Sequence, residues 1–143
     1  MSSNDASLLC FLIIIINMKS PCELIVWYLL PAIRAELSKA LKKEHVLQKD
    51  TAEYLDMTPS AVSLYISGKR GGDMELPGEI KLKIQELAKR IIAEDMSPYT
   101  VMKCLCPICV EIRKKKILCD IHKKIDKGLP DDCDFWKESN ECL

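Results

Sequence analysis

The sequence lacks several features that would narrow its function at once. Its formal net charge is zero, with 21 basic and 21 acidic side chains, so no global attraction draws it to nucleic acid or membrane and a charged partner must be met locally. It has no Gly-rich phosphate loop and no constellation of carboxylates, which argues against an enzyme. It also has no convincing strand pattern and no internal repeat, so the expected fold class is all-α.

The sequence also has no apolar run long enough to cross a membrane. The best candidate, Leu8–Ile16, is much shorter than the roughly twenty residues that a spanning helix needs. No Lys or Arg precedes it and no small-x-small site follows, so it is a poor signal peptide. We therefore expect a cytoplasmic protein with no membrane association. Residues 1–17 are either an apolar N-terminal extension or a misassigned start, because Met18 follows directly.

Two longer stretches have the periodicity of amphipathic helices. Residues 22–45 place apolar side chains at three-to-four spacing, and Pro31 within them should kink the helix or divide it. Residues 77–95 predict a second helix, with an apolar face that consists of Ile80, Ile84, Leu87, Ile91 and Ile92.

Between these stretches lie two short helical patterns, residues 48–56 and 59–68, joined by a tight turn. Thr58 is a natural N-cap, Pro59 suits the first helical position, and Gly68 is a good C-terminal stop. The small Ala52 allows two helices to cross closely, and three apolar residues are expected to fix their angle: Leu55, Val62 and Tyr65. This combination predicts a helix-turn-helix.

The stretch Gln48–Lys69 resembles the phage-repressor, Cro-like or XRE-type helix-turn-helix. It departs from the family at Asp56, where a left-handed Gly is usual, although Asp tolerates that conformation better than most residues. Together with "PCELIVWYLLPAIRAEL", "SGKRGG" and the cysteine-rich end, it is similar to a group of archaeal XRE-type regulators. The resemblance implies a Cro-like bundle that binds double-stranded DNA as a homodimer and regulates transcription.

The resemblance also places the DNA contacts. The N-terminal part of the second helix would enter the major groove and present Pro59, Ser60, Ser63 and Leu64 to base edges. Phosphate contacts would come from Gln48, Thr58, Ser67, Lys69 and Arg70. We expect the dimer surface on the apolar face of residues 80–91 or on the helix that carries Trp27 and Tyr28.

The segment "CLCPICVEIRKKKILCDIH" contains two pairs of candidate metal ligands. Cys106 and Cys109 form one pair and Cys119 and His122 the other, each at the two-residue gap that lets both side chains reach one ion in a tight turn. Four such ligands suit tetrahedral zinc. If Cys133, and not His122, is the fourth ligand, the set would instead suit an iron–sulfur cluster.

These patterns predict a DNA-binding domain over residues 18–95 and a small cysteine-rich tail of metal knuckles over residues 100–143. The basic run Arg113–Lys116 is either a solvated turn between knuckles or an extra phosphate contact. Two other functions stay open: a protein-interaction adaptor that docks through the metal knuckle, and a redox protein that uses the Cys106–Cys109 dithiol.

Overall fold

The computed structural model describes residues 21–132, and these residues form helices joined by loops, with no strand among them. The expected all-α class is therefore confirmed for this part of the chain. Residues 1–20 and 133–143, which include the apolar N-terminal segment and Cys133, lie outside the described residues. Among residues 21–132, no helix combines the length and the apolar character needed to cross a membrane.

The first helical stretch is continuous but changes its geometry ahead of Pro31. It runs through α2 (Pro21–Leu24), a π-helical turn η1 (Ile25–Leu29) and α3 (Leu30–Lys43). At the junction the Leu30 N–H donates to the carbonyl of Ile25, one residue further back than in an α-helix. Pro31 lacks an N–H and cannot donate the hydrogen bond that a continuous α-helix needs at its position. The new helix α3 therefore begins at Leu30, so that Pro31 lies in the first turn, where a missing N–H costs little stability.

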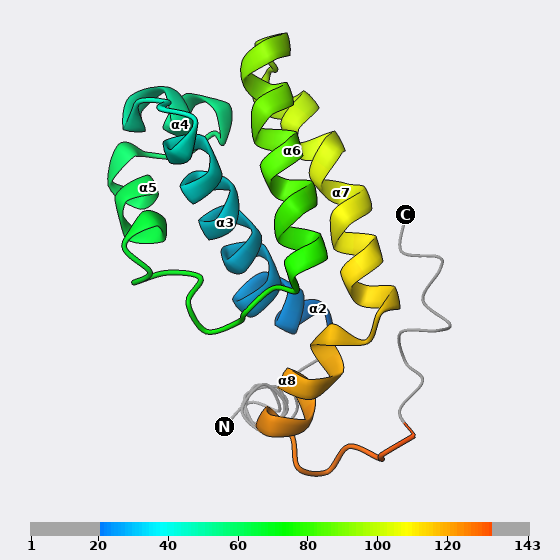
Figure 1. The fold of residues 1–143 in the computed structure, drawn as a ribbon. Coiled ribbons are helices and arrows are strands. Elements are labelled where there is room, and N and C mark those ends of the chain that lie inside the picture. Colours follow the sequence, from blue (N-terminus) through cyan, green and yellow to red (C-terminus); the bar gives the residue numbers. More distant parts are fainter. Residues whose placement is uncertain (1–20, 133–143) are drawn as a thin grey trace, which may run out of the picture.

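Helix α3 is the centre of the bundle (Figure 1). On one side it packs against α5 (Pro59–Ile66), and on another against α6 (Gly78–Glu94). Helix α4 (Gln48–Tyr54) joins α3 to α5 at one end. The side chains of α3 that face these neighbours are buried: Ala32, Ile33, Ala35, Leu37, Ser38, Ala40 and Leu41.

Helix α6 buries most, but not all, of its predicted apolar face. Ile80, Ile84, Leu87 and Ile91 are buried against α3 and α7. Ile92 is exposed, which corrects the prediction, because it lies 100° round the helix from Ile91. The same burial overturns the expectation that Ile80, Ile84, Leu87 and Ile91 form a dimer surface, since they fill the interior of a single chain.

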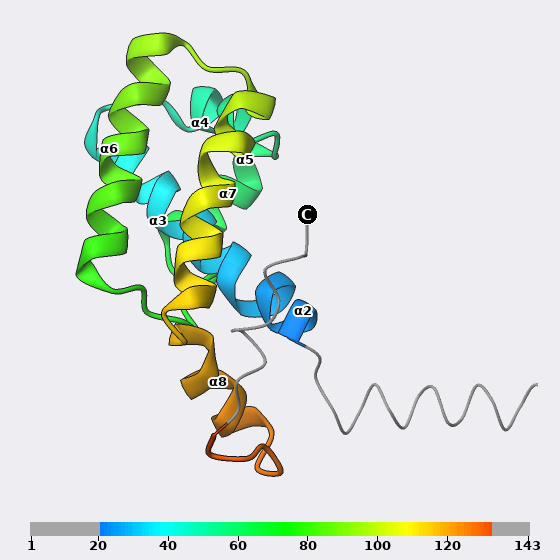
Figure 2. The same cartoon turned by 90° about the vertical axis from the view of Figure 1, so that its right-hand side faces the viewer.

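The cysteine-rich segment is helical where the structure describes it. Helix α7 (Pro98–Lys114) lies alongside α6, and α8 (Ile117–Ile125) continues below the end of α7, near α2 (Figures 1 and 2). Val101, Ile108, Ile112 and Leu118 of these helices belong to the same hydrophobic cluster as α3 and α6. The boundary predicted between residues 95 and 100 therefore separates helices that share one core.

Ion pairs join α6 to α7 on the side that faces solvent. Lys83 pairs with Glu111, and Lys115 bridges Glu111 and Glu79 with both N–O distances at 2.7 Å. Lys115 and Lys83, through their hydrogen bonds, lower the pKa of the Glu111 carboxyl. Exposed pairs of this kind stabilise a protein little one by one, but a connected group fixes the register of two helices better.

Candidate nucleic-acid interface

Helices α4 and α5 pack against each other and are joined by the short turn between Leu55 and Thr58. Ala52 is buried at the crossing, and Val62 and Tyr65 are buried beneath α5, as the sequence predicts. Leu55 is only half-buried and lies against the core from the turn. The buried side of α5 therefore rests on α3 and α4, and its opposite side faces solvent.

The turn between the two helices depends on a left-handed residue. Asp56 has φ +49°, the conformation that the sequence comparison with the Cro-like pattern suggested for this position. It lets the Met57 N–H return to the carbonyl of Ala52 at 3.0 Å, which ends α4. Thr58 then caps α5, because its Oγ1 accepts a hydrogen bond from the Ala61 N–H at 3.2 Å. The predicted cap is thus confirmed.

A side-chain contact connects the first turns of the two helices. Nε2 of Gln48, the first residue of α4, donates a hydrogen bond to the carbonyl of Pro59, the first residue of α5, at 2.6 Å. From the sequence, Gln48 is predicted to contact a phosphate. The bond to Pro59 gives Gln48 a structural role as well, because it holds the N-termini of α4 and α5 at a fixed distance.

The exposed side of α5 carries short polar side chains. Pro59, Ser60, Ser63 and Ser67 are exposed and Leu64 is half-buried. Ser67 Oγ donates back to the Leu64 carbonyl at 3.1 Å, which leaves its lone pairs outward. Beside this side lies a groove of about 540 Å³ between α5 and the α3–α4 turn, lined by Lys42, Val46, Leu47, Gln48, Thr51, Ser63, Ile66 and Ser67.

Four cations surround this exposed side. Lys69 and Arg70 follow α5 directly, and the Arg70 N–H donates to the Leu64 carbonyl at 3.1 Å, so the loop returns against the helix end. Lys42 and Lys49 lie at the other edge, at the end of α3 and the start of α4. Within residues 21–132 no ion pair neutralises any of the four.

Lys42 and Lys49 are the two cations at this side that were not predicted from the sequence, and Lys42 lies in the groove itself. Its position in the last turn of α3 gives no signal of proximity to α5. His45, left-handed at φ +63°, reverses the chain after α3 and brings α4 back along it. The packing of α3 against α5 then makes Lys42 a neighbour of Ser63 in the groove.

The basic run Arg113–Lys116 lies elsewhere. It forms the end of α7 and the turn to α8, where Lys116 is left-handed at φ +58°. Helix α7 meets α4 near its beginning, and its 17 residues span about 25 Å. Lys115 is also paired with Glu79 and Glu111. This position favours the solvated-turn interpretation over an extra phosphate contact beside α5.

The predicted metal ligands are not gathered around one point. Cys106 and Cys109 lie in successive turns of α7, whereas Cys119 and His122 lie in α8. Among residues 21–132, no three His, Cys, Asp or Glu side chains are placed to hold an ion together. The two pairs therefore do not fit a tetrahedral site in this arrangement, and Cys133 lies outside the described residues.

Two details describe the chemistry of the cysteine pair. Burial raises the pKa of the Cys109 thiol, which is opposite to the depressed value of a redox nucleophile. Pro107, between the two cysteines, lies inside α7. A proline there removes a helical hydrogen bond and costs about 3 kcal/mol, so α7 is locally weakest at this pair. The metal assignment stays a prediction that would require α7 to open near Pro107.

Comparisons with known proteins do not identify the chain. No family model matches it, and no curated protein or solved structure does so either. The interpretation of the site therefore rests on its own geometry and on the sequence pattern.

Proposed function

We propose that this protein is a sequence-specific DNA-binding transcriptional regulator that inserts the start of α5 into the major groove. The observation that supports this most is the α4–α5 unit. It has a left-handed turn at Asp56, a capped α5, and a Gln48–Pro59 bond that fixes the spacing of the two N-termini. A unit so fixed presents α5 as a rigid outward element, which a groove-reading helix requires.

Base contacts would come from the exposed side of α5. Ser60 and Ser63 can donate to or accept from base edges, and Leu64 can touch a thymine methyl. None of these side chains makes the bidentate contact by which Arg reads guanine or Asn reads adenine. Each half-site would therefore be read weakly, with further discrimination from half-site spacing and DNA shape.

Phosphate contacts would flank the groove on both sides. The Thr58 hydroxyl keeps its hydrogen for a phosphate oxygen, since only its lone pair is used by the Ala61 N–H. Lys69 and Arg70 lie at the other end of α5, and Ser67 there would donate to a phosphate oxygen by turning its hydroxyl away from the Leu64 carbonyl. Lys42 joins Gln48 at the α3–α4 edge. These groups supply the local positive charge that a chain of zero net charge needs in order to bind DNA.

A homodimer would bring two such helices to half-sites about one DNA turn apart. With the α6 face buried, the other predicted surface remains for this contact. Val26 is 59% exposed and Trp27 66% exposed on η1, and Tyr28 is half-buried beside them. A monomeric mass by light scattering, both free and on DNA, would exclude this assembly.

The DNA proposal is tested by the salt dependence of binding. Duplexes selected from random sequence are measured by fluorescence anisotropy over a salt series. Lys69→Ala with Arg70→Ala should weaken binding to all sequences and flatten the slope of log K against log salt by about 2 per protomer. Ser60→Ala or Ser63→Ala should instead change the preferred sequence.

The matched control removes two cations far from α5. Lys114 and Lys124 are exposed, lie in the last turns of α7 and α8, and form no ion pair within the described residues. Lys114→Ala with Lys124→Ala should leave the affinity and the slope unchanged. Equal losses in both double variants would mean non-specific attraction, and no selected duplex at all would refute the proposal.

A further inference from the structure

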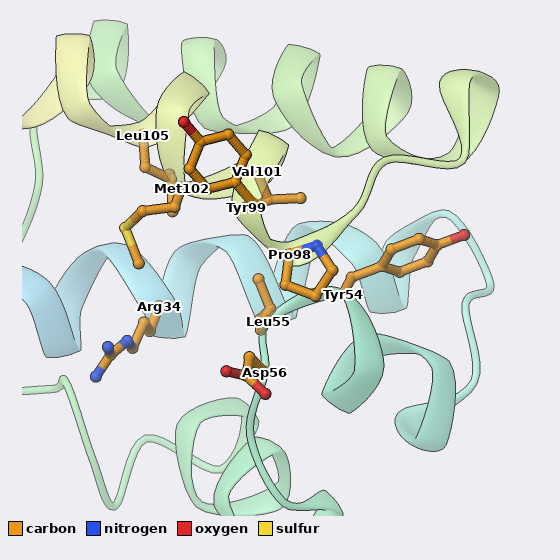
Figure 3. A pocket seen from close by; sticks show the side chains of 9 residues that line it. All are labelled: Arg34, Tyr54, Leu55, Asp56, Pro98, Tyr99, Val101, Met102 and Leu105. Atoms are coloured by element: carbon orange, nitrogen blue, oxygen red, sulfur yellow. The ribbon is translucent and has the colours of Figure 1, made fainter.

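A second cavity, of about 320 Å³, lies where α3, the α4–α5 turn and α7 meet. Figure 3 shows the side chains that line it: Arg34 from α3, Tyr54, Leu55 and Asp56 at the end of α4, and Pro98, Tyr99, Val101, Met102 and Leu105 from α7. Its volume is at the lower end of the range in which proteins bind small molecules. None of its lining residues belongs to the proposed DNA-contacting set.

The walls of this cavity are largely apolar, and part of its rim is open to water. Leu55, Val101 and Leu105 are partly or fully buried and form the lining. At the rim Tyr99 is 72% exposed and Met102 is 51% exposed, which is unusual for such large apolar side chains in one place. Met102 extends from α7 toward α3 (Figure 3). Because a methionine side chain is flexible and polarizable, Met102 can adapt to the shape of an apolar group that enters the cavity.

Two opposite charges stand at the same cavity without neutralising each other. Arg34 and Asp56 both line it, yet within residues 21–132 neither takes part in an ion pair. Arg34 is half-buried within α3, and the backbone of Asp56 is held in the left-handed conformation of the α4–α5 turn. The Arg34 guanidinium is suited to bind a carboxylate, and the Asp56 carboxylate is suited to bind an ammonium group. Together they are complementary to a ligand that carries a carboxylate and an ammonium group.

We propose that this cavity binds a free α-amino acid with an apolar side chain. Arg34 would take the carboxylate, Asp56 the ammonium group, and the side chain would lie against Leu55, Val101 and Met102. This arrangement satisfies both charges and covers the exposed rim at once. A purely apolar molecule would leave both charges unused, and a simple anion would face the Asp56 carboxylate.

Amino-acid binding to this cavity does not depend on DNA, whereas an effect of the bound amino acid on DNA affinity rests on the proposed function. Asp56 is the residue that shapes the α4–α5 turn, so a bound ammonium group would touch the segment that sets the angle of α5. If occupancy changes the DNA affinity, DNA must change the amino-acid affinity by the same factor. Binding measured without DNA separates a failure of this proposal from a failure of the DNA proposal.

The experiment is isothermal titration calorimetry of the full chain with L-leucine, L-methionine and L-phenylalanine. At least one of the three is expected to bind saturably. Three further titrations use molecules that each lack one recognised group: glycine, methionine amide and N-acetyl-methionine. Methionine amide and N-acetyl-methionine should each bind at least about tenfold more weakly than methionine, because a charged partner is left unpaired. Glycine should bind at least about tenfold more weakly than the best of the three amino acids, because it leaves the apolar lining uncovered. No saturable heat with any of the three amino acids would overturn the proposal.

Variants test which residue binds each charged group of the ligand. Arg34→Met keeps the apolar stem and should abolish the preference for methionine over methionine amide. Asp56→Asn keeps a residue that tolerates the left-handed turn and should abolish the preference for methionine over N-acetyl-methionine. Lys69→Ala with Arg70→Ala, the DNA-contact variant, should bind amino acids as the wild type does. Variants of Arg34 and Asp56 that keep both preferences would refute the assignment, even if they bind.

Discussion

Gly71 is the position at which a single methyl group should test the packing of the loop that follows α5. Its φ is +73°, which L-residues rarely adopt. A Cβ built on it would lie 2.3 Å from the Pro31 carbonyl oxygen and 2.8 Å from the Ala35 Cβ, both on α3. The loop after α5 therefore passes directly against the backbone of the central helix and then buries Met74 and Leu76 in the core.

The cost of Gly71→Ala has two parts. The left-handed conformation costs about 1–2 kcal/mol for any residue with a Cβ, partly offset by the lower entropy of the unfolded alanine chain. Relief of the contact requires the loop or α3 to move by about 1 Å, because the oxygen belongs to a helix backbone and cannot rotate away. Overpacking of this kind adds about 1–3 kcal/mol. We expect a total loss of about 2–4 kcal/mol in the free energy of unfolding.

Gly68→Ala is the matched control. Gly68 is also left-handed, at φ +79°, but a Cβ there would meet no atom within 4 Å. It should lose only the conformational part, about 1 kcal/mol. Urea denaturation followed by far-UV circular dichroism measures both variants. Equal losses would show that the close approach of Gly71 to α3 carries no energy, and the reasoning would fail.

Two further predictions concern the α6–α7 ion pairs and the cysteine pair. Because Lys115 and Lys83 lower the pKa of Glu111, the stability they confer is present above the unfolded value of about 4.3 and is lost as the pH falls through the folded value. Urea denaturation at pH 7 and pH 4 should show a smaller acid loss in Glu111→Gln than in the wild type; equal losses would contradict this. For the metal prediction, elemental analysis of anaerobically purified protein should find zinc, or iron with sulfide, and Cys106→Ser with Cys109→Ser should remove it. A variant that keeps its full metal content would exclude these ligands.

Short-range chemistry of the sequence determined where α5 and α3 begin and where α5 ends. Thr58 caps α5 and Gly68 adopts the left-handed conformation just past its end, as their residue types predict. Pro31 marks the start of α3 for the same reason, since a missing N–H acts within one helical turn. These features could be predicted because each depends on residues only a few positions apart.

The periodicity of α6 identified its buried face to within one residue. Ile80, Ile84, Leu87 and Ile91 are inside, and only Ile92 was placed wrongly. Periodicity did not show what this face packs against. It therefore suggested a dimer contact where the structure has α3 and α7 of the same chain.

Tertiary structure decided the features that depend on residues far apart in the sequence. It placed the cysteine-rich segment in the common core, because Val101, Ile108 and Ile112 repeat at helical spacing and α6 offers them an apolar face. The spacing of the cysteines in the sequence could not distinguish a core helix from a metal-binding turn. It also brought Arg34 and Asp56 to one cavity, across 22 positions of the chain and two helix ends. Such proximity depends on how α3, α4 and α7 pack together, and no local pattern of residues encodes it.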